Sequence, residues 1–106
     1  MADGYQEYKR NQRELDAFEA WQTVKTAELL AAQRKATTRR EHAGVAFFKA
    51  RDKFVQKFSD RNRQRLIDAE TTFRAAVAAE VNALEELEQA RAKFSFEIWE
   101  QEQKQE

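Results

Sequence analysis

The sequence predicts an all-α fold, either a long helical hairpin or an elongated two- to three-helix bundle with coiled-coil character. The 106 residues include no Pro and only two Gly. Ala, Glu, Gln, Lys and Arg dominate the rest, so almost every position tolerates or favours helix. Apolar residues also recur at the spacing of one helix face through roughly half of the chain.

The apolar content predicts a thin core. Hydrophobic residues make up 42% of the chain, but 18 of them are Ala, which leaves only 26 larger ones. We therefore expect residues 1–106 to form a single helical unit that relies on a partner to cover part of its apolar surface.

The first predicted helix covers residues 5–38. Its apolar face is broad, although Gln22 and Lys25 interrupt it. This face comprises Tyr8, Leu15, Phe18, Trp21, Leu29 and Ala32. We expect a break at about 37–44, because the β-branched pair Thr37 and Thr38 precedes Gly44, the only Gly in the interior of the chain.

A long helix is predicted over residues 45–103. At about 100° per residue, its apolar residues fall within one sector of the helix. They are Phe47, Phe48, Phe54, Val55, Phe58, Leu66, Ala69, Phe73, Ala76, Val77, Leu84, Leu87, Phe94 and Ile98. The long helix has two alternative positions for a bend. One is near 59–60, where Ser59 or Asp60 suits a helix cap. The other is near 71–72, where two Thr are adjacent, and a bend there would give a three-helix bundle.

A hairpin folded near residue 41 would leave the end of the long helix uncovered. About 25 residues would then have no intramolecular partner. The large apolar residues of this end form the predicted partner interface: Val81, Leu84, Leu87, Phe94, Phe96, Ile98 and Trp99. The segment from Phe94 to Trp99 is interpreted either as a terminal docking plug or as the seal of an intramolecular bundle.

The charge is balanced overall but unevenly distributed. Residues 1–65 hold 15 basic and 9 acidic side chains, whereas residues 66–106 hold 4 and 10. The predicted contacts for an anionic partner are Lys49, Lys53, Lys57, Arg61, Arg63 and Arg65. An acidic protein surface, including another copy of the chain, is the favoured partner; a solvated face and nucleic-acid phosphate are alternatives.

Four polar residues fall on the long apolar stripe: Arg51, Asn62, Glu80 and Arg91. They either extend their polar ends to water at the edge of the seam, or they fix its alignment with a partner helix.

No pattern in the sequence indicates catalysis. Cys is absent, the single His42 has no carboxylate three or four residues away, and no phosphate-binding loop or zinc motif occurs. We expect no cofactor or metal, and no membrane span or secretory signal, hence a soluble protein in the cytoplasm or inside a large assembly. The predicted function is a non-catalytic assembly subunit or adaptor that packs against partner helices, in other protein subunits or further copies of itself. The alternative is a nucleic-acid-binding helical protein that uses the basic segment 34–65.

Overall fold

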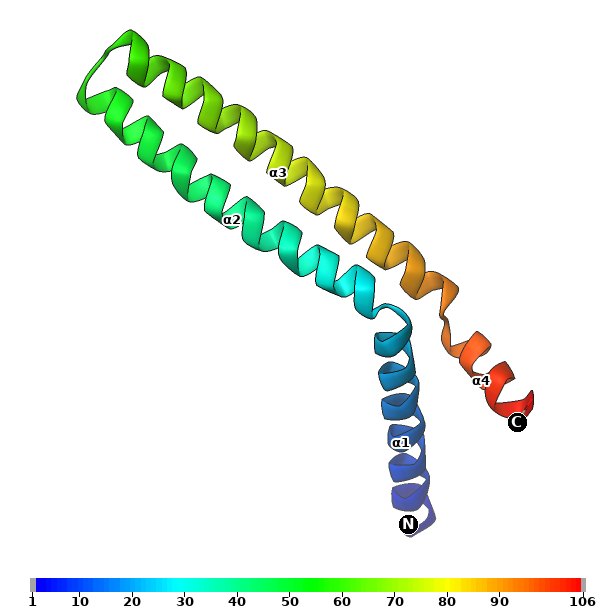
Figure 1. The fold of residues 1–106 in the computed structure, drawn as a ribbon. Coiled ribbons are helices and arrows are strands. Elements are labelled where there is room, and N and C mark those ends of the chain that lie inside the picture. The colour runs from blue at the N-terminus through cyan, green and yellow to red at the C-terminus, as the bar shows by residue number, and fades with distance from the viewer. Residues whose placement is uncertain (1, 106) are drawn as a thin grey trace.

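The computed structural model describes residues 2–105, which form four helices and no strand. They are α1 (Ala2–Lys25), α2 (Ala27–Gln56), α3 (Asp60–Lys93) and α4 (Phe96–Gln105). The molecule is elongated, with extents of 73 × 32 × 14 Å. Figure 1 shows α2 and α3 side by side as a long antiparallel hairpin, with both termini at the end opposite its turn. The prediction of an all-α helical hairpin is confirmed.

The hairpin reverses at residues 57–59. α2 ends at Gln56, and Lys57 adopts an extended backbone. Ser59 caps α3, because its Oγ accepts a hydrogen bond of 3.0 Å from the backbone N–H of Asn62. The Nδ2 of Asn62 donates back across the turn to the carbonyl of Lys57 at 2.9 Å. The candidate bend at 59–60 is therefore the place where the chain turns completely.

The break expected at 37–44 is wrong, because α2 runs through it without interruption. Gly44 serves close packing instead of a turn: a Cβ built on it would lie 3.1 Å from Cε2 of Phe73 in α3. The first interruption comes earlier, at Thr26, whose side chain is buried and donates from Oγ1 to the carbonyl of Gln22 at 2.8 Å.

The other candidate bend, at 71–72, is also absent. α3 passes through Thr71 and Thr72. Both hydroxyls donate to carbonyls four residues back, those of Ile67 and Asp68, at 3.0 Å. The side chains thus bond within the helix and do not interrupt its backbone ladder.

Small residues form much of the seam between α2 and α3. Ala43, Ala76 and Ala90 are buried there, together with Leu87. Phe47 and Phe73 stack across the seam with ring centroids 5.7 Å apart and an interplanar angle of 5°. No side chain in the described part of the chain is more than 98% buried, so the core is as thin as the composition predicts.

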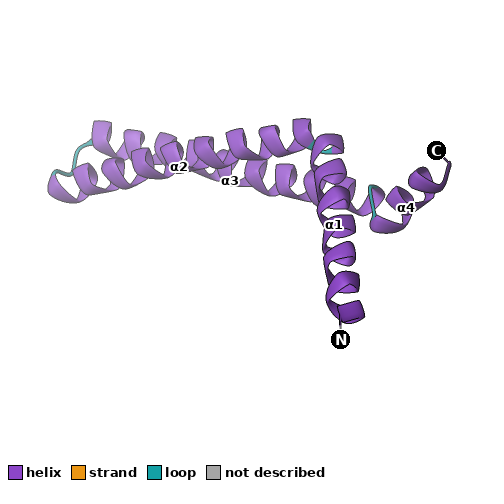
Figure 2. Cartoon of the chain, turned by 90° about the horizontal axis from the view of Figure 1, so that it is seen from below, coloured by secondary structure: helices purple, strands orange, loops and turns teal. Residues whose placement is uncertain are grey.

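The helices α1 and α4 form a second, smaller contact at the open end of the hairpin. α1 turns away from α2 at Thr26, as both views show (Figures 1 and 2). Its C-terminal half meets α4 through aromatic rings: Phe18 packs edge-on against Phe96 at 5.3 Å and lies 6.1 Å from Trp99. Trp21 packs edge-on against Phe94 at 5.6 Å. Residues 3–17 of α1 are exposed.

Candidate functional site

The hairpin has two broad faces, which follow from the order of residues along each helix. Successive side chains are separated by about 100°, so the residue before an inward-facing position and the residue after it lie on opposite sides. Because α2 and α3 are antiparallel, the residues that follow inward-facing ones gather on one face of the hairpin in both helices. The residues that precede them gather on the other.

We call the first of these the apolar face. Its large hydrophobic members follow the buried or half-buried positions 44, 47, 54, 66, 80 and 83, and by the same rule Arg51, Arg63 and Arg74 also lie on it. The hydrophobic members are Val45, Phe48, Val55, Ile67, Val81 and Leu84. Their exposed fractions run from 40% for Leu84 to 77% for Val55. They include every large hydrophobic residue that is exposed in α2 and α3; within the hairpin only Phe58, in the turn, adds to them.

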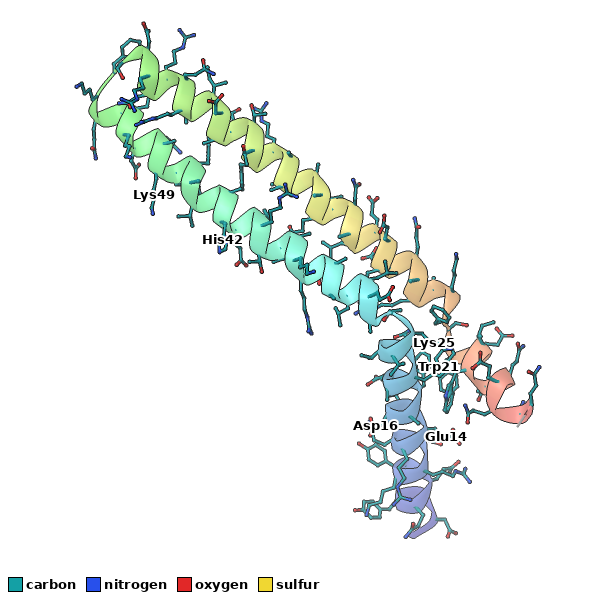
Figure 3. All side chains as sticks on the ribbon, in the orientation of Figure 1. Glu14, Asp16, Trp21, Lys25, His42 and Lys49 are labelled. Atoms are coloured by element: carbon teal, nitrogen blue, oxygen red, sulfur yellow. The ribbon has the colours of Figure 1, made fainter. Side chains whose placement is uncertain are left out.

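We call the second the cationic face. Its members precede the inward-facing positions 36, 40, 50, 54, 62 and 66. They are Lys35, Arg39, Lys49, Lys53, Arg61 and Arg65. His42 precedes the buried Ala43 and lies in the same row. Figure 3 shows His42 and Lys49 on the same side of α2, the side directed away from α3.

Two hollows lie along this face. The first, of about 330 Å³, spans both helices near the turn. It is lined by Ala46, Lys49, Ala50, Lys53, Asn62 and Arg65. The second, of about 440 Å³, lies on α2 further from the turn. It is lined by Arg34, Lys35, Thr38, Arg39 and His42. Both are open and rimmed by cations, so they suit an extended anionic ligand.

The cation series found in the sequence is divided by the turn. Because α2 ends at Gln56, the cations of this series come from two different helices that meet at the closed end of the hairpin, and they do not lie along a single helix. Lys49 and Lys53 come from α2, Arg61 and Arg65 from α3, and Lys57 lies in the turn. Arg63 departs from the group, since it follows the inward Asn62 and lies toward the apolar face.

These cations have no acidic partner within the described residues, where the ion pairs are Arg40 with Glu41 and Glu80, and Arg74 with Glu70. Residues 49–65 hold seven basic and two acidic side chains. The closed end of the hairpin is therefore strongly positive.

The partner interface expected from the sequence rests on a wrong premise. The hairpin turns at 57–59 and not near 41, so α2 covers α3 along its length. Leu87 and Trp99 are buried within the chain, and Phe94 is half-buried. Val81, Leu84, Phe96 and Ile98 stay between 37% and 45% exposed. Phe94 and Trp99 thus pack against rings of α1, whereas Val81 and Leu84 belong to the apolar face.

Of the four polar residues on the stripe, Glu80 alone pairs across the hairpin. Its Oε1 lies 2.9 Å from Nε of Arg40, with both side chains partly buried. The hydroxyl of Thr37 and the guanidinium of Arg40 hold the pKa of Glu80 below its usual value. Asn62 stabilises the turn, and the side chains of Arg51 and Arg91 are exposed.

The sequence stripe does not separate Val45, Phe48, Val55 and Ile67 as a distinct surface. It includes Phe48 and Val55 in the same sector as the true seam residues Phe47 and Phe54, because neighbouring positions differ by only about 100°. Which edge of that sector is covered by the other helix depends on where the chain turns between α2 and α3. The row from Lys35 to Lys53 does have a signal in the sequence, the spacing 35, 39, 42, 46, 49, 53, which alternates four and three.

Within residues 2–105, no group of three or more His, Cys, Asp or Glu side chains is arranged to hold a metal ion. None of the described helices has a stretch sufficiently long and apolar to span a bilayer. Comparisons with protein-family models, curated proteins and solved structures find no match.

Proposed function

We propose that this chain is a non-catalytic assembly subunit or adaptor, which packs the apolar face of its hairpin against the helices of a partner protein. The observation that carries the proposal is the gathering of exposed hydrophobic side chains. Val45, Phe48, Val55, Ile67, Val81 and Leu84 all lie on one face. Scattered exposed hydrophobic residues are normal on a protein surface, but a gathering along one face of two packed helices is typical of an interface.

The thin seam of the hairpin supports the same proposal. Much of what α2 and α3 bury against each other is Ala, which contributes little apolar area. A partner that covered Phe48 and Val55 would supply the burial that the chain lacks. Each such side chain contributes about 1.5–3 kcal/mol when fully buried.

The proposal is tested by sedimentation velocity of the full chain over a range of concentrations. We expect self-association, because an uncovered apolar face pairs with another molecule when its partner is absent. The double variant Phe48→Ser/Val55→Ser should shift the chain toward monomer while its helix content, measured by circular dichroism, stays unchanged.

A matched control is available on α1. Tyr5 and Val24 are exposed to the same extent as Phe48 and Val55, at 59% and 76% against 57% and 77%. The variant Tyr5→Ser/Val24→Ser should associate like the unchanged chain. If the unchanged chain is a monomer that melts cooperatively at all concentrations, or if both variants reduce association equally, the apolar face is not an interface.

A further inference from the structure

The cationic face contains a straight row of positive groups that the assembly function does not use. Positions 35, 39, 42, 46, 49 and 53 follow one another by four and three residues, so they form one line along the continuous helix α2. Lys35, Arg39, Lys49 and Lys53 provide its charges. At 1.5 Å per residue, the row extends over about 27 Å.

The helix α3 widens this row near the turn. Arg65 lines the same hollow as Lys49 and Lys53, and Arg61 lies one turn before Arg65 on the same side of α3. Between the cations the hollow is lined by Ala46, Ala50 and Asn62, so no aromatic or large aliphatic side chain separates the charges. In the sequence Asp52 adjoins Lys53, Asp60 adjoins Arg61 and Asp68 follows Arg65 by three residues, whereas Glu28 and Glu86 lie at the open end of the hairpin.

We propose that the cationic face binds the phosphate backbone of double-stranded nucleic acid, independently of base sequence. Lys and Arg neutralise phosphates through contacts that need no apolar anchor. Docking of an acidic protein would need large buried side chains at its centre. In α2 and α3 the exposed large hydrophobic residues lie on the opposite face. The surface therefore favours phosphate over an acidic protein.

The side chains of the row also favour a duplex over a single strand. Proteins that bind single strands stack bases on aromatic rings. The six positions of the row hold no Phe, Tyr or Trp. The amide of Asn62, which could otherwise hydrogen-bond a base edge, is engaged by the carbonyl of Lys57.

The charge distribution restricts where a nucleic acid can lie. Residues 49–65 hold seven basic and two acidic side chains, whereas residues 80–102 hold two basic and seven acidic ones. A polyanion is therefore attracted to the closed end of the hairpin and repelled from the end that carries both termini. Zero net charge is compatible with binding because the charges are separated along the molecule.

The test measures binding of the full chain to a fluorescently labelled 20-base-pair duplex of arbitrary sequence, by anisotropy at several salt concentrations. The variant Lys35→Gln/Lys49→Gln/Lys53→Gln removes three charges from the row. We expect its affinity to fall at least about tenfold at low salt. The slope of log K against log salt should become shallower by about 0.9 for each phosphate that the variant no longer neutralises.

The control variant Lys9→Gln/Lys25→Gln/Lys104→Gln removes the same charge from exposed positions on α1 and α4. Its affinity should stay within about twofold of the unchanged chain, since these lysines lie outside the cationic face. A second row variant, Lys35→Arg/Lys49→Arg/Lys53→Arg, retains the charges and should bind like the unchanged chain. Circular dichroism of each variant establishes that the helices are intact.

Three results would overturn the proposal. The first is no duplex binding at low salt, and the second is an equal loss of affinity in the row and control variants, which would indicate a dependence on net charge alone. The third is tighter binding of a polyglutamate peptide or of single-stranded DNA than of the duplex. Polyglutamate would identify an acidic protein as the partner. Because Phe48 and Val55 lie on the other face, failure of this test leaves the proposed assembly function intact.

Discussion

The ion pair between Arg40 and Glu80 joins two residues that are 40 positions apart in the chain and links α2 to α3. From the sequence, Glu80 is recognisable as a polar residue on an apolar stripe, and a role in alignment is a natural hypothesis for it. Its partner is not recognisable, because a residue's neighbour across a hairpin depends on where the chain turns. The pairing is intramolecular, so we expect Glu80 to align α2 with α3 and not with a partner helix.

The variant Glu80→Gln should destabilise the hairpin in a pH-dependent manner. Thr37 and Arg40 lower the pKa of Glu80 in the folded chain below its ordinary value of 4.5. A carboxyl with a lowered folded pKa stabilises the fold fully above its unfolded pKa, and that stabilisation is lost as the pH falls through the folded pKa. Thermal melts at several pH values should show the largest deficit of the variant near neutral pH.

The deficit should shrink below pH 4.5 and disappear under more acidic conditions, where Glu80 is protonated in the unchanged chain as well. Glu85→Gln is the control, because Glu85 is exposed and has no ion pair among the described residues. A deficit of Glu80→Gln that is the same at every pH would show that the charge of Glu80 does not stabilise the hairpin.

At the scale of elements, helix content was predictable but helix ends were not. The absence of Pro and the abundance of helix-forming residues indicate helix almost everywhere, and the structure agrees. The true turn depends on the cap formed by Ser59, a weak local signal. The apparent breaker Gly44 lies mid-helix because Phe73 packs against it. Tertiary packing therefore overrode the stronger sequence signal.

The small helix α4 should depend on its aromatic contact with α1. Trp99 is buried, and its ring lies 6.1 Å from that of Phe18. Trp99→Ala removes most of the apolar surface that α4 buries, so the backbone of α4 should open locally. In hydrogen-exchange mass spectrometry, peptides from residues 96–105 should exchange at least about tenfold faster, while those from α2 and α3 change little.

Ile98→Ala is the matched control within the same helix, because Ile98 is 40% exposed whereas Trp99 is 9% exposed. Its effect on exchange in α4 should be clearly smaller. If Trp99→Ala instead speeds exchange equally in α2, α3 and α4, then the aromatic contact stabilises the whole chain and α4 is not an independent unit.

At the scale of the whole molecule, the sequence predicts an elongated shape and an uncovered apolar surface, but not the location of that surface. The uneven distribution of charge can be counted in the sequence, but the surface that the cations form depends on the turn at 57–59. This turn places Lys53 and Arg61 together at the closed end of the hairpin. The turn also moves the uncovered surface from the end of a long helix to a face of the hairpin, where Phe48 and Val55 lie.

The molecule should keep its elongated shape in solution. Its Cα radius of gyration is 22.6 Å, whereas a compact domain of this length has about 13 Å. A more compact fold would have α1 folded back along the hairpin as a third helix, covering the apolar face. The contacts near the C-terminal end of α1 oppose this. Trp21 packs on Phe94, and Nε2 of Gln22 donates to the carbonyls of Arg91 and Phe94 at 3.3 and 3.1 Å.

Small-angle X-ray scattering of the Phe48→Ser/Val55→Ser variant, extrapolated to zero concentration, measures this shape without self-association. We expect a radius of gyration close to 22.6 Å, because the contacts of Trp21 and Gln22 keep α1 turned away from the apolar face. A radius near the compact value would show that α1 folds onto the hairpin. In that case the chain would cover its own hydrophobic surface, and the need for a partner, on which the proposed assembly function rests, would disappear.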